Sequence, residues 1–224
     1  MIGLQVLERE RAVDLALAER FLAVPVANVS DCMARMSAGG ARLRPMHAGG
    51  SMAGPALTVK VRPGDNLLVH KALQMAMPGD VIIVDAGGDL TNAIIGEIMV
   101  GEAVRLKLGG MVVDGAVRDA RAIRAGTFPV FAAGVTHRGP YKDGPGEINV
   151  PIAIDGMVVN PGDLVIGDDD GILCIPFVQA EALLAAAIRK GVAEAKMISD
   201  MASGKYDAGW IDANLKRIGW VDGQ

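Results

Sequence analysis

Aromatic residues, cysteines and excess positive charge are all scarce in this chain, and each shortage argues against a class of protein. Only 4% of the residues are aromatic and the net charge is −4. The chain therefore has few rings for stacking on bases and no basic surface for nucleic acid or anionic membranes. Cys32 and Cys174 are the only cysteines, and neither lies in a Cys-x-x-Cys pair or a Cys/His cluster. We expect neither a disulfide scaffold nor a structural zinc site.

Long apolar runs are also missing. No run approaches the ~20 residues of a membrane-spanning helix. Glu8, Arg9, Glu10 and Arg11 lie where a signal peptide would have its apolar core, so we expect a cytoplasmic protein in a reducing compartment. A hydrophobic content of 51% over 224 residues indicates a folded chain with one well-packed domain and an appendage.

The order of apolar segments predicts a mixed α/β domain. Helices are expected over residues 14–24, from about Ser30, and over 66–77, 94–108 and 180–201. Strands are expected over residues 57–61, 81–85, 111–113, 129–132, 148–154, 157–159, 164–166 and 172–175. The early strands alternate with helices, as in parallel β-α-β units. The late strands are joined by Asp155-Gly156 and by a turn at 168–171, which favour antiparallel pairing.

The tripeptide Pro-Gly-Asp occurs three times, at residues 63–65, 78–80 and 161–163. Proline sets the φ of the second turn residue and glycine accepts the positive φ of the third, so each copy predicts a tight turn. Metal ligation by these aspartates is the alternative, but a turn already explains them. Farther on, Trp210 and Trp220 lie in a polar tail. They indicate that the tail docks on a neighbouring subunit or on the chain's own core.

Residues 112–119 end an apolar strand with a guanidinium and a carboxylate side by side. Asp114-Gly115 is expected to form the turn after the strand. A strand would send Arg118 and Asp119 to opposite faces, so we place both on the turn that enters a helix over 120–124, where both can reach one pocket. The alternative is structural: Asp119 caps that helix and Arg118 pairs with a surface acid.

A second candidate element lies upstream, where Gly96-Glu97 opens the helix that runs toward Leu108. The N–H groups at this helix start, including those of Ile98 and Met99, would bind a carboxylate through hydrogen bonds and the helix dipole. Glu97 also has a structural explanation, because the dipole favours an acid in the first turn whatever its function.

Together these residues would fit a small 2-oxo acid held against a divalent metal. The helix start would bind the acid's carboxylate and Arg118 would supply positive charge. Asp119 would be the metal ligand, and Glu97 would reach the waters around the metal. One or two carboxylates suffice for Mg²⁺ or Mn²⁺, because these ions favour oxygen donors and Mg²⁺ commonly keeps several waters.

Two rival mechanisms find less support. A lysine Schiff base needs a desolvated amine, and the neighbours of Lys60, Lys71, Lys107 and Lys142 do not predict one. A Ser-His-Asp hydrolase would need a Gly-x-Ser-x-Gly turn, which the sequence lacks. The three histidines, at positions 47, 70 and 137, share no metal-ligand spacing, and we assign them no role.

A series of motifs runs in order through residues 26–176: GPALT (54–58), PGDN (63–66), PGDV (78–81), GE (96–97), DGAVRD (114–119), FPVFA (128–132), PGD (161–163) and GDDDG (167–171). In this series the chain resembles the regulator of ribonuclease activity A-like family. That family includes the class II 4-hydroxy-4-methyl-2-oxoglutarate/4-carboxy-4-hydroxy-2-oxoadipate aldolases.

The resemblance implies an α/β fold of the swivelling β/β/α type with mixed sheets. We expect a single domain over residues 1–224, with a core over about 26–176 and a helical C-terminal extension over 177–224. Assembly into homotrimers or homohexamers, with active sites between subunits, is also implied.

The resemblance assigns roles to the candidate residues. Asp119 would hold the metal, largely through waters, and Arg118 would contact the 2-oxo group of the substrate. The amides of residues 96–99 would bind the pyruvyl carboxylate, and Glu97 would order the waters around the metal. A glutamate from the C-terminal region of the adjacent subunit would complete the site. Glu194 is the nearest match, with Glu181 as the alternative.

The implied reaction is a divalent-metal-dependent retro-aldol cleavage of a 4-hydroxy-2-oxo acid, of the 4-hydroxy-4-methyl-2-oxoglutarate or 4-carboxy-4-hydroxy-2-oxoadipate type, that releases pyruvate. Oxaloacetate decarboxylation is expected as a side activity because it passes through the same enolate. Other members of the family are protein-binding regulators that inhibit an RNA-degrading endonuclease, which is the alternative function. The regulators are similar to the core alone, so the extension over 177–224 favours the enzyme.

Overall fold

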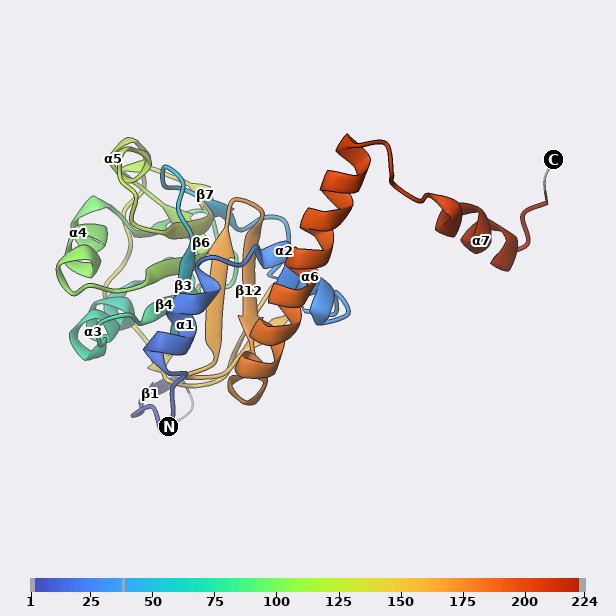
Figure 1. Ribbon diagram of the computed structural model, residues 1–224. Coiled ribbons are helices and arrows are strands. Elements are labelled where there is room, and N and C mark those ends of the chain that lie inside the picture. The colour runs from blue at the N-terminus through green and yellow to red at the C-terminus, as the bar shows by residue number, and fades with distance from the viewer. Residues whose placement is uncertain (1–2, 38, 222–224) are drawn as a thin grey trace. The chain divides into compact units, whose positions relative to one another are not determined.

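The computed structural model describes residues 3–37 and 39–221 (Figure 1). The helices are α1 (Leu15–Phe21), α2 (Val26–Cys32), α3 (Leu67–Met75), α4 (Glu97–Arg105), α5 (Ala120–Ala125), η1 (Phe177–Gln179), α6 (Ala180–Ala202) and α7 (Gly209–Arg217). The strands are β1 (Leu4–Val6), β2 (Arg44–Pro45), β3 (Met52–Val61), β4 (Val81–Asp85), β5 (Ala93–Ile95), β6 (Gly110–Val117), β7 (Val130–Val135), β8 (Gly146–Ile148), β9 (Ile152–Ile154), β10 (Met157–Val159), β11 (Leu164–Asp168) and β12 (Gly171–Ile175).

The chain divides into two compact units, residues 1–187 and 188–224. The first unit continues past the predicted core into the start of α6, because Ala180, Leu184 and Ala187 are buried among core residues. The single domain over residues 1–224, with a helical extension from residue 177, stays a prediction. No helix in the described ranges is both long and apolar enough to span a bilayer.

Strands β3, β4, β6 and β7 run parallel and form the centre of the main sheet. Side chains along a strand alternate between its faces. Ile82 and Val84 of β4 therefore pack in a cluster with residues of α3, α4 and α5, while Val81 and Ile83 pack in a second cluster with residues of β9 to β12. The helices α3, α4 and α5 gather on one side of the sheet in Figure 1.

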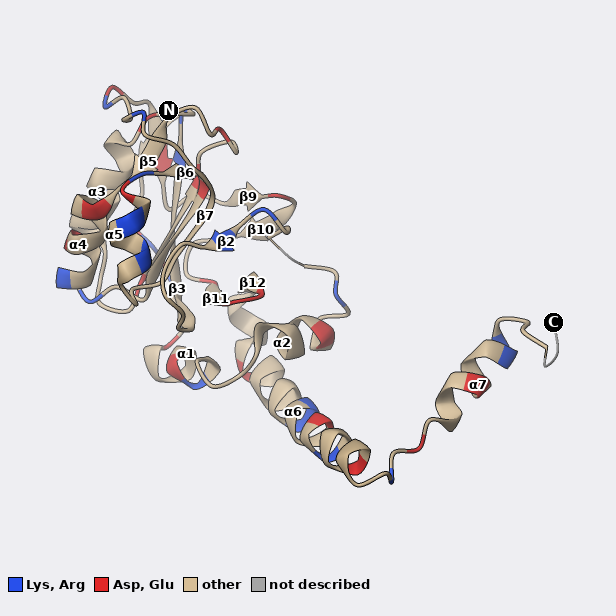
Figure 2. Ribbon diagram, turned by 90° about the horizontal axis from the view of Figure 1, so that it is seen from above, with Lys and Arg blue, Asp and Glu red and all other residues tan. Residues whose placement is uncertain are grey.

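A third cluster packs the outer faces of β11 and β12 against α1, α2 and the start of α6. The first unit therefore has four layers. Helices α3, α4 and α5 cover one face of the main sheet, strands β9 to β12 cover the other face, and α1, α2 and the start of α6 pack on the outside of β11 and β12. Figure 2 shows that the ribbon positions of Lys, Arg, Asp and Glu lie mainly on the helices and loops, while the central strands are mostly tan. The predicted mixed α/β fold, with parallel pairing early, antiparallel pairing late and a C-terminal helix, is confirmed.

The three Pro-Gly-Asp turns are confirmed by backbone geometry. Gly64, Gly79 and Gly162 have φ of 78°, 86° and 83°, which glycine adopts without a steric penalty. The aspartates complete the turns: the backbone N–H of Met77 donates to Asp80 (2.9 Å), and all three aspartates of the motif are buried. These carboxylates serve structure, within the turns and toward distant segments of the chain.

The prediction of a turn at Asp114-Gly115 was wrong. Strand β6 continues through Val117 with every residue buried. Its pairing with β7 shifts register between Val113 and Ala116, so Asp114 and Gly115 remain within the strand. Burial raises the pKa of Asp114, while the nearby Arg42 guanidinium opposes that rise. The Arg42 Nη2 atom lies 2.9 Å from the carboxylate, so a partner distant in sequence allows a charged residue inside the strand.

Two helix starts also differ from the prediction. Helix α2 begins at Val26, not near Ser30, because Asp168 from β11 accepts a hydrogen bond from the Val26 N–H (2.9 Å) and so caps the helix from outside. Residues 93–95 form strand β5, and α4 begins only at Glu97. Ile94 and Ile95 are buried in the core under α3 and α4, which explains why an apolar run beside a helix belongs to the sheet.

Candidate functional site

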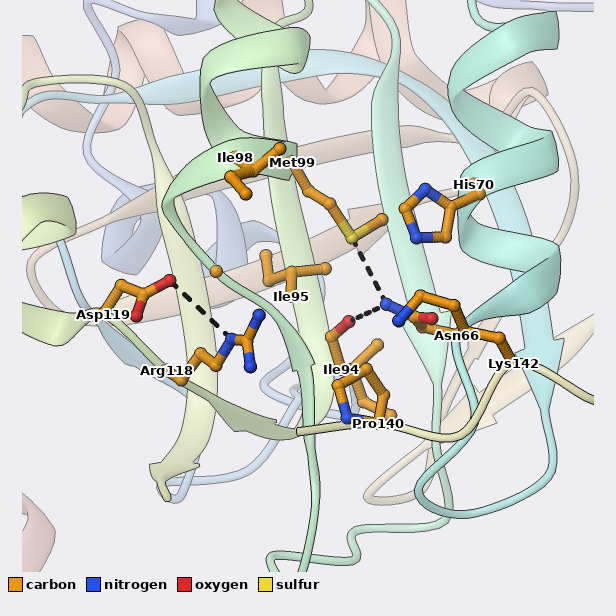
Figure 3. Close-up of a pocket in the computed structure, with 11 residues that line it drawn as sticks. Asn66, His70, Ile94, Ile95, Ile98, Met99, Arg118, Asp119, Pro140 and Lys142 are labelled. Atoms are coloured by element: carbon orange, nitrogen blue, oxygen red, sulfur yellow. Dashed lines mark hydrogen bonds and ion pairs between the residues drawn. The ribbon is translucent and has the colours of Figure 1, made fainter. Parts of the chain in front are cut away.

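Connections that follow four strands converge on one pocket of about 130 Å³ (Figure 3). Asn66 lies between β3 and α3, Gly96 follows β5, Arg118 follows β6 and Lys142 follows β7. Open α/β sheets bind their ligands at the carboxyl ends of parallel strands. The topology therefore explains why residues from four parts of the chain meet here.

Arg118 and Asp119 lie at the turn into α5, as predicted, and both line the pocket. Asp119 is the N-cap residue of α5 with a φ of 55°, but its side chain makes no cap hydrogen bond to α5, so the side-chain cap that the alternative explanation requires is not formed. Its Oδ2 atom accepts a hydrogen bond from the backbone N–H of Glu97 (3.0 Å) and lies 3.8 Å from Nε of Arg118. One carboxylate therefore joins the end of β6 to the start of α4.

Gly96 is required by this close approach. A Cβ atom placed on Gly96 would overlap Oδ2 of Asp119 and lie 3.0 Å from Cγ of Arg118. The residue is the N-cap of α4 in an extended conformation, with φ of −152°, so space rather than backbone strain demands glycine. The helix start can thus lie directly beside the charged pair.

Replacing Gly96 with alanine is expected to displace Asp119 and Arg118, and for the aldol cleavage proposed below to lower kcat/KM by ~100-fold, because a shift of about 1 Å in a reacting group can have an effect of that size. The matched control is Gly101→Ala in the same helix, where an added Cβ meets no atom within 4 Å. That control should keep full activity and gain about 0.5–1 kcal/mol of stability. Steady-state kinetics on both variants decide the matter, and equal losses would contradict a special role for the helix start.

Three residues that the sequence did not single out also line the pocket: Asn66, His70 and Lys142. Asn66 is only 3% exposed, and its Nδ2 donates to the carbonyl of Ile94 (2.8 Å) and to Sδ of Met99 (3.4 Å). Burial lowers the pKa of His70, and the positive charge of Lys142 lowers it further. Both effects favour the neutral imidazole over its charged form.

Asp65 holds the connection that carries Lys142. Its fully buried carboxylate accepts hydrogen bonds from the N–H groups of Leu67 (2.9 Å), Asp143 (2.7 Å) and Gly144 (2.9 Å). Burial alone would raise the pKa of Asp65, but these three donors, with a smaller contribution from Arg62, outweigh it and lower the pKa below the ordinary value of 3.8. The ionised carboxylate ties the loop to the start of α3.

Replacing Asp65 with asparagine is expected to lower the free energy of unfolding by about 3 kcal/mol at pH 7, since the buried donors lose their charged acceptor. A lowered folded-state pKa means that the wild-type stabilisation exists above pH 3.8 and is lost as pH falls through the folded value. Urea unfolding at pH 7 and near pH 3 should therefore show a smaller pH dependence in the variant.

The control for this experiment is Asp143→Asn in the same loop. The Asp143 side chain is 75% exposed, and its Oδ2 atom lies 3.9 Å from Nη2 of Arg62. Removing its charge should therefore change the free energy of unfolding by less than ~0.5 kcal/mol. Equal effects of the two substitutions would contradict the role assigned to Asp65.

The remaining predicted residues are placed as follows. Ile98 and Met99 line the pocket, with Ile98 82% exposed and Met99 buried. Glu97 starts α4 and is exposed, and Glu181 lies exposed in the first turn of α6. Glu194 belongs to the second unit and forms an ion pair with Lys190 (2.9 Å). The catalytic and binding roles of these residues stay predictions.

The chemistry of Asp119 suits a hydrated divalent cation. In the described residues no group of three or more His, Cys, Asp or Glu could hold a metal, so a site within this chain would depend on water for most ligands. Mg²⁺ commonly accepts one or two carboxylates and keeps several waters. The Asp119 side chain is 41% exposed, which leaves room for that hydration, and Arg118 beside it favours a metal held together with an anionic ligand.

Fold and pocket together define a class: an α/β protein with a small pocket between a helix start and an Arg-Asp pair. The chain belongs to the RraA-like family, described as Aldolase/RraA, whose model matches residues 26–174. The predicted family membership is confirmed.

Relatives within the family carry two kinds of name. The chain is 44% identical over 171 residues to the "Putative 4-hydroxy-4-methyl-2-oxoglutarate aldolase" of Halalkalibacterium halodurans, covering 76% of this chain and 81% of the relative. It is 38% identical over 112 residues to the 4-hydroxy-4-methyl-2-oxoglutarate aldolase of Thermus thermophilus, covering 50% and 68%. The crystal structure of Streptomyces coelicolor RraAS2, described as an unusual member of the RNase ES inhibitor RraA protein family, matches with a TM-score of 0.74 and 27% identity over 82% of this chain and 96% of that one.

Proposed function

We propose that this protein cleaves 4-hydroxy-2-oxo acids of the 4-hydroxy-4-methyl-2-oxoglutarate or 4-carboxy-4-hydroxy-2-oxoadipate type by a metal-dependent retro-aldol reaction that releases pyruvate. The observation that carries the proposal is the meeting of Arg118, Asp119 and the N-terminus of α4 in one pocket. The aldolase names of relatives at 44% and 38% identity support it.

Each group has a part in binding the 2-oxo acid. The N–H of Glu97 already donates to Asp119, so the amides of Ile98 and Met99 are the ones that would bind the pyruvyl carboxylate, aided by the helix dipole. The guanidinium of Arg118 would donate to the 2-oxo oxygen. Ile94 and Ile95 supply an apolar wall, which lowers the local dielectric and strengthens these contacts.

Bond cleavage then follows from charge stabilisation. A divalent cation held by Asp119 would act as a Lewis acid toward the 2-oxo group. As the C3–C4 bond breaks, its electron pair moves toward C2, and Arg118 stabilises the negative charge that develops on the oxygen. The C4 hydroxyl loses its proton to a water positioned by Glu97 and becomes a carbonyl. Protonation of the three-carbon enolate at C3 gives pyruvate, and oxaloacetate would lose CO₂ through the same enolate.

We further propose that the subunits assemble as homotrimers or homohexamers, with Glu194 or Glu181 of a neighbouring subunit completing the pocket. Ile98 supports this proposal, because an isoleucine that lines a pocket at 82% exposure would be covered by a second chain. Light scattering on the purified protein tests the assembly directly, and a monomer at catalytic concentrations would contradict it.

The second candidate is a protein-binding regulator that inhibits an RNA-degrading endonuclease, favoured by the match to RraAS2. A coupled pyruvate-release assay separates the two. The assay would cover a panel of 4-hydroxy-2-oxo acids and oxaloacetate, with Mg²⁺, with Mn²⁺ and with chelator. We expect metal-dependent pyruvate release. No pyruvate from any substrate would favour the regulator, full activity with chelator would eliminate the metal, and trapping by borohydride would indicate a lysine Schiff base.

A further inference from the structure

Two buried carboxylates in this protein are held in different ways. Asp65 accepts hydrogen bonds from three backbone N–H groups. Asp114 is only 3% exposed, and within the described ranges its only hydrogen-bond donor is Nη2 of Arg42, 3.0 Å from Oδ2. Its Oδ1 atom is buried without a hydrogen-bond partner there. A buried carboxylate with a single donor is poorly stabilised in its ionised form, so Asp114 takes up a proton more readily than Asp65.

Acidic neighbours act on Asp114 in the same direction. Asp85 on β4 is its register partner, and Lys60 on β3 is one strand farther away, paired in register with Asp85. Asp155 lies between β9 and β10, with Oδ2 3.7 Å from Nε of Arg42. Burial raises the pKa of Asp114, Arg42 lowers it, and Asp85 and Asp155 raise it further, which leaves it above the ordinary value of 3.8.

The segment that carries this arginine, residues 39–43, lies against the second strand layer. A Cβ atom on Gly39 would lie 2.8 Å from Cγ1 of Ile172, and one on Gly40 would overlap a carboxylate oxygen of the β9–β10 turn. Leu43 is fully buried in the same apolar cluster as Ile172. The segment therefore covers part of that cluster, and glycines allow the close approach.

Proton binding by Asp114 is coupled to the attachment of Arg42. Because Arg42 lowers the pKa of Asp114, that pKa is higher when the guanidinium is released, and proton uptake therefore favours release. A pKa raised by folding also means that Asp114 stabilises the fold most when it is protonated, and that this contribution falls as pH rises through the folded value. Asp65 has a lowered pKa, so a falling pH protonates Asp114 first.

We infer that Asp114 and Arg42 form a proton-operated latch over the second strand layer. Protonation of the carboxylate releases the guanidinium, and residues 39–43 then separate from the sheet, which itself stays folded. The release exposes apolar side chains under the segment, among them Ile172 and Met157. The latch is distinct from the pocket of the proposed reaction, because none of these residues lines that pocket.

Hydrogen exchange at pH 7 tests the latch with two matched variants. Asp114→Asn carries a neutral group of nearly the same shape and so reproduces the protonated side chain. We expect the amides of residues 39–43 to exchange ~10-fold or more faster than in the wild type, because a charged hydrogen bond is lost. Asp85→Asn is the control, since Asp85 lies beside Asp114 but forms no ion pair with Arg42 within the described ranges. Wild-type exchange over 39–43 in Asp114→Asn would overturn the latch.

The pH dependence of the wild type gives a second test, which also serves if Asp114→Asn does not fold. Exchange at pH 7 and at about pH 4.5, each corrected for the intrinsic rate, should show a loss of protection confined to residues 39–43 at the lower pH. Arg42→Met lacks the guanidinium and should show low protection of this segment at both pH values. Protection that does not change with pH in the wild type, or a loss that extends through β4 and β6, would contradict the inference.

Discussion

Asp119→Ala is expected to lower metal-dependent pyruvate release by at least ~1000-fold, to the background rate, because it removes the carboxylate proposed to hold the cation. The same change removes the acceptor of the Glu97 N–H, so the start of α4 also loses its link to the end of β6. Coupled assays at saturating Mg²⁺ and Mn²⁺ would measure the loss.

The fold should survive this substitution, since the Asp119 side chain is 41% exposed. Alanine does meet a cost of about 1–2 kcal/mol in the left-handed conformation, which Asp119 adopts with φ of 55°. Asp119→Asn avoids that cost, because asparagine tolerates this conformation and keeps an oxygen for the Glu97 N–H. The asparagine variant should be as inactive as the alanine variant while melting like the wild type. Substantial activity in Asp119→Asn would contradict the assignment of the metal ligand.

Arg118→Ala is expected to reduce kcat by ~100-fold or more, since removing one donor to a developing oxyanion typically has an effect of that size. The guanidinium lies next to Asp119 and its side chain is 41% exposed at the pocket. The loss should appear in kcat more than in KM, because the negative charge on the 2-oxo oxygen develops only as the bond breaks.

Arg118→Lys distinguishes charge from geometry. Lysine keeps the positive charge but cannot present the planar fork of a guanidinium, so we expect only partial recovery of kcat. Arg121→Ala on the exposed face of α5 is the surface control and should be unchanged. A wild-type kcat in Arg118→Ala would mean that the arginine binds no reacting atom.

The sequence predicted the elements whose signals are local. Strand β4 was predicted at its observed bounds, Val81–Asp85, because a continuous apolar run between turns admits little else. The turn glycines were predicted from the conformation that Pro-Gly-Asp requires, and their φ values agree. The predicted strand ended before Asp114, whereas β6 continues to Val117. The sequence did not show this because the burial of the Asp114 carboxylate depends on Arg42, which lies 72 residues away.

The site shows the same difference between local sequence signals and contacts from distant parts of the chain. Arg118, Asp119 and Gly96 could be proposed because each lies at a strand-to-helix junction, and the structure brings them together. Asn66 and Lys142 were not proposed, because Asn66 was assigned to a turn motif and Lys142 has no distinctive neighbour in sequence. The loop that carries Lys142 is bonded to Asp65, which lies 78 residues before Asp143 in the chain. The PGDN motif at 63–66 contained the signal, but it was explained as a turn.

Proton exchange in pyruvate gives the most direct test that this pocket stabilises a pyruvate enolate beside a metal at Asp119. Wild-type protein would be incubated with pyruvate and Mg²⁺ in D₂O, and the methyl signal followed by proton NMR. We predict metal-dependent loss of that signal, abolished by chelator and by Asp119→Asn. A metal-loaded wild type that binds pyruvate yet leaves its methyl protons unexchanged would contradict the account.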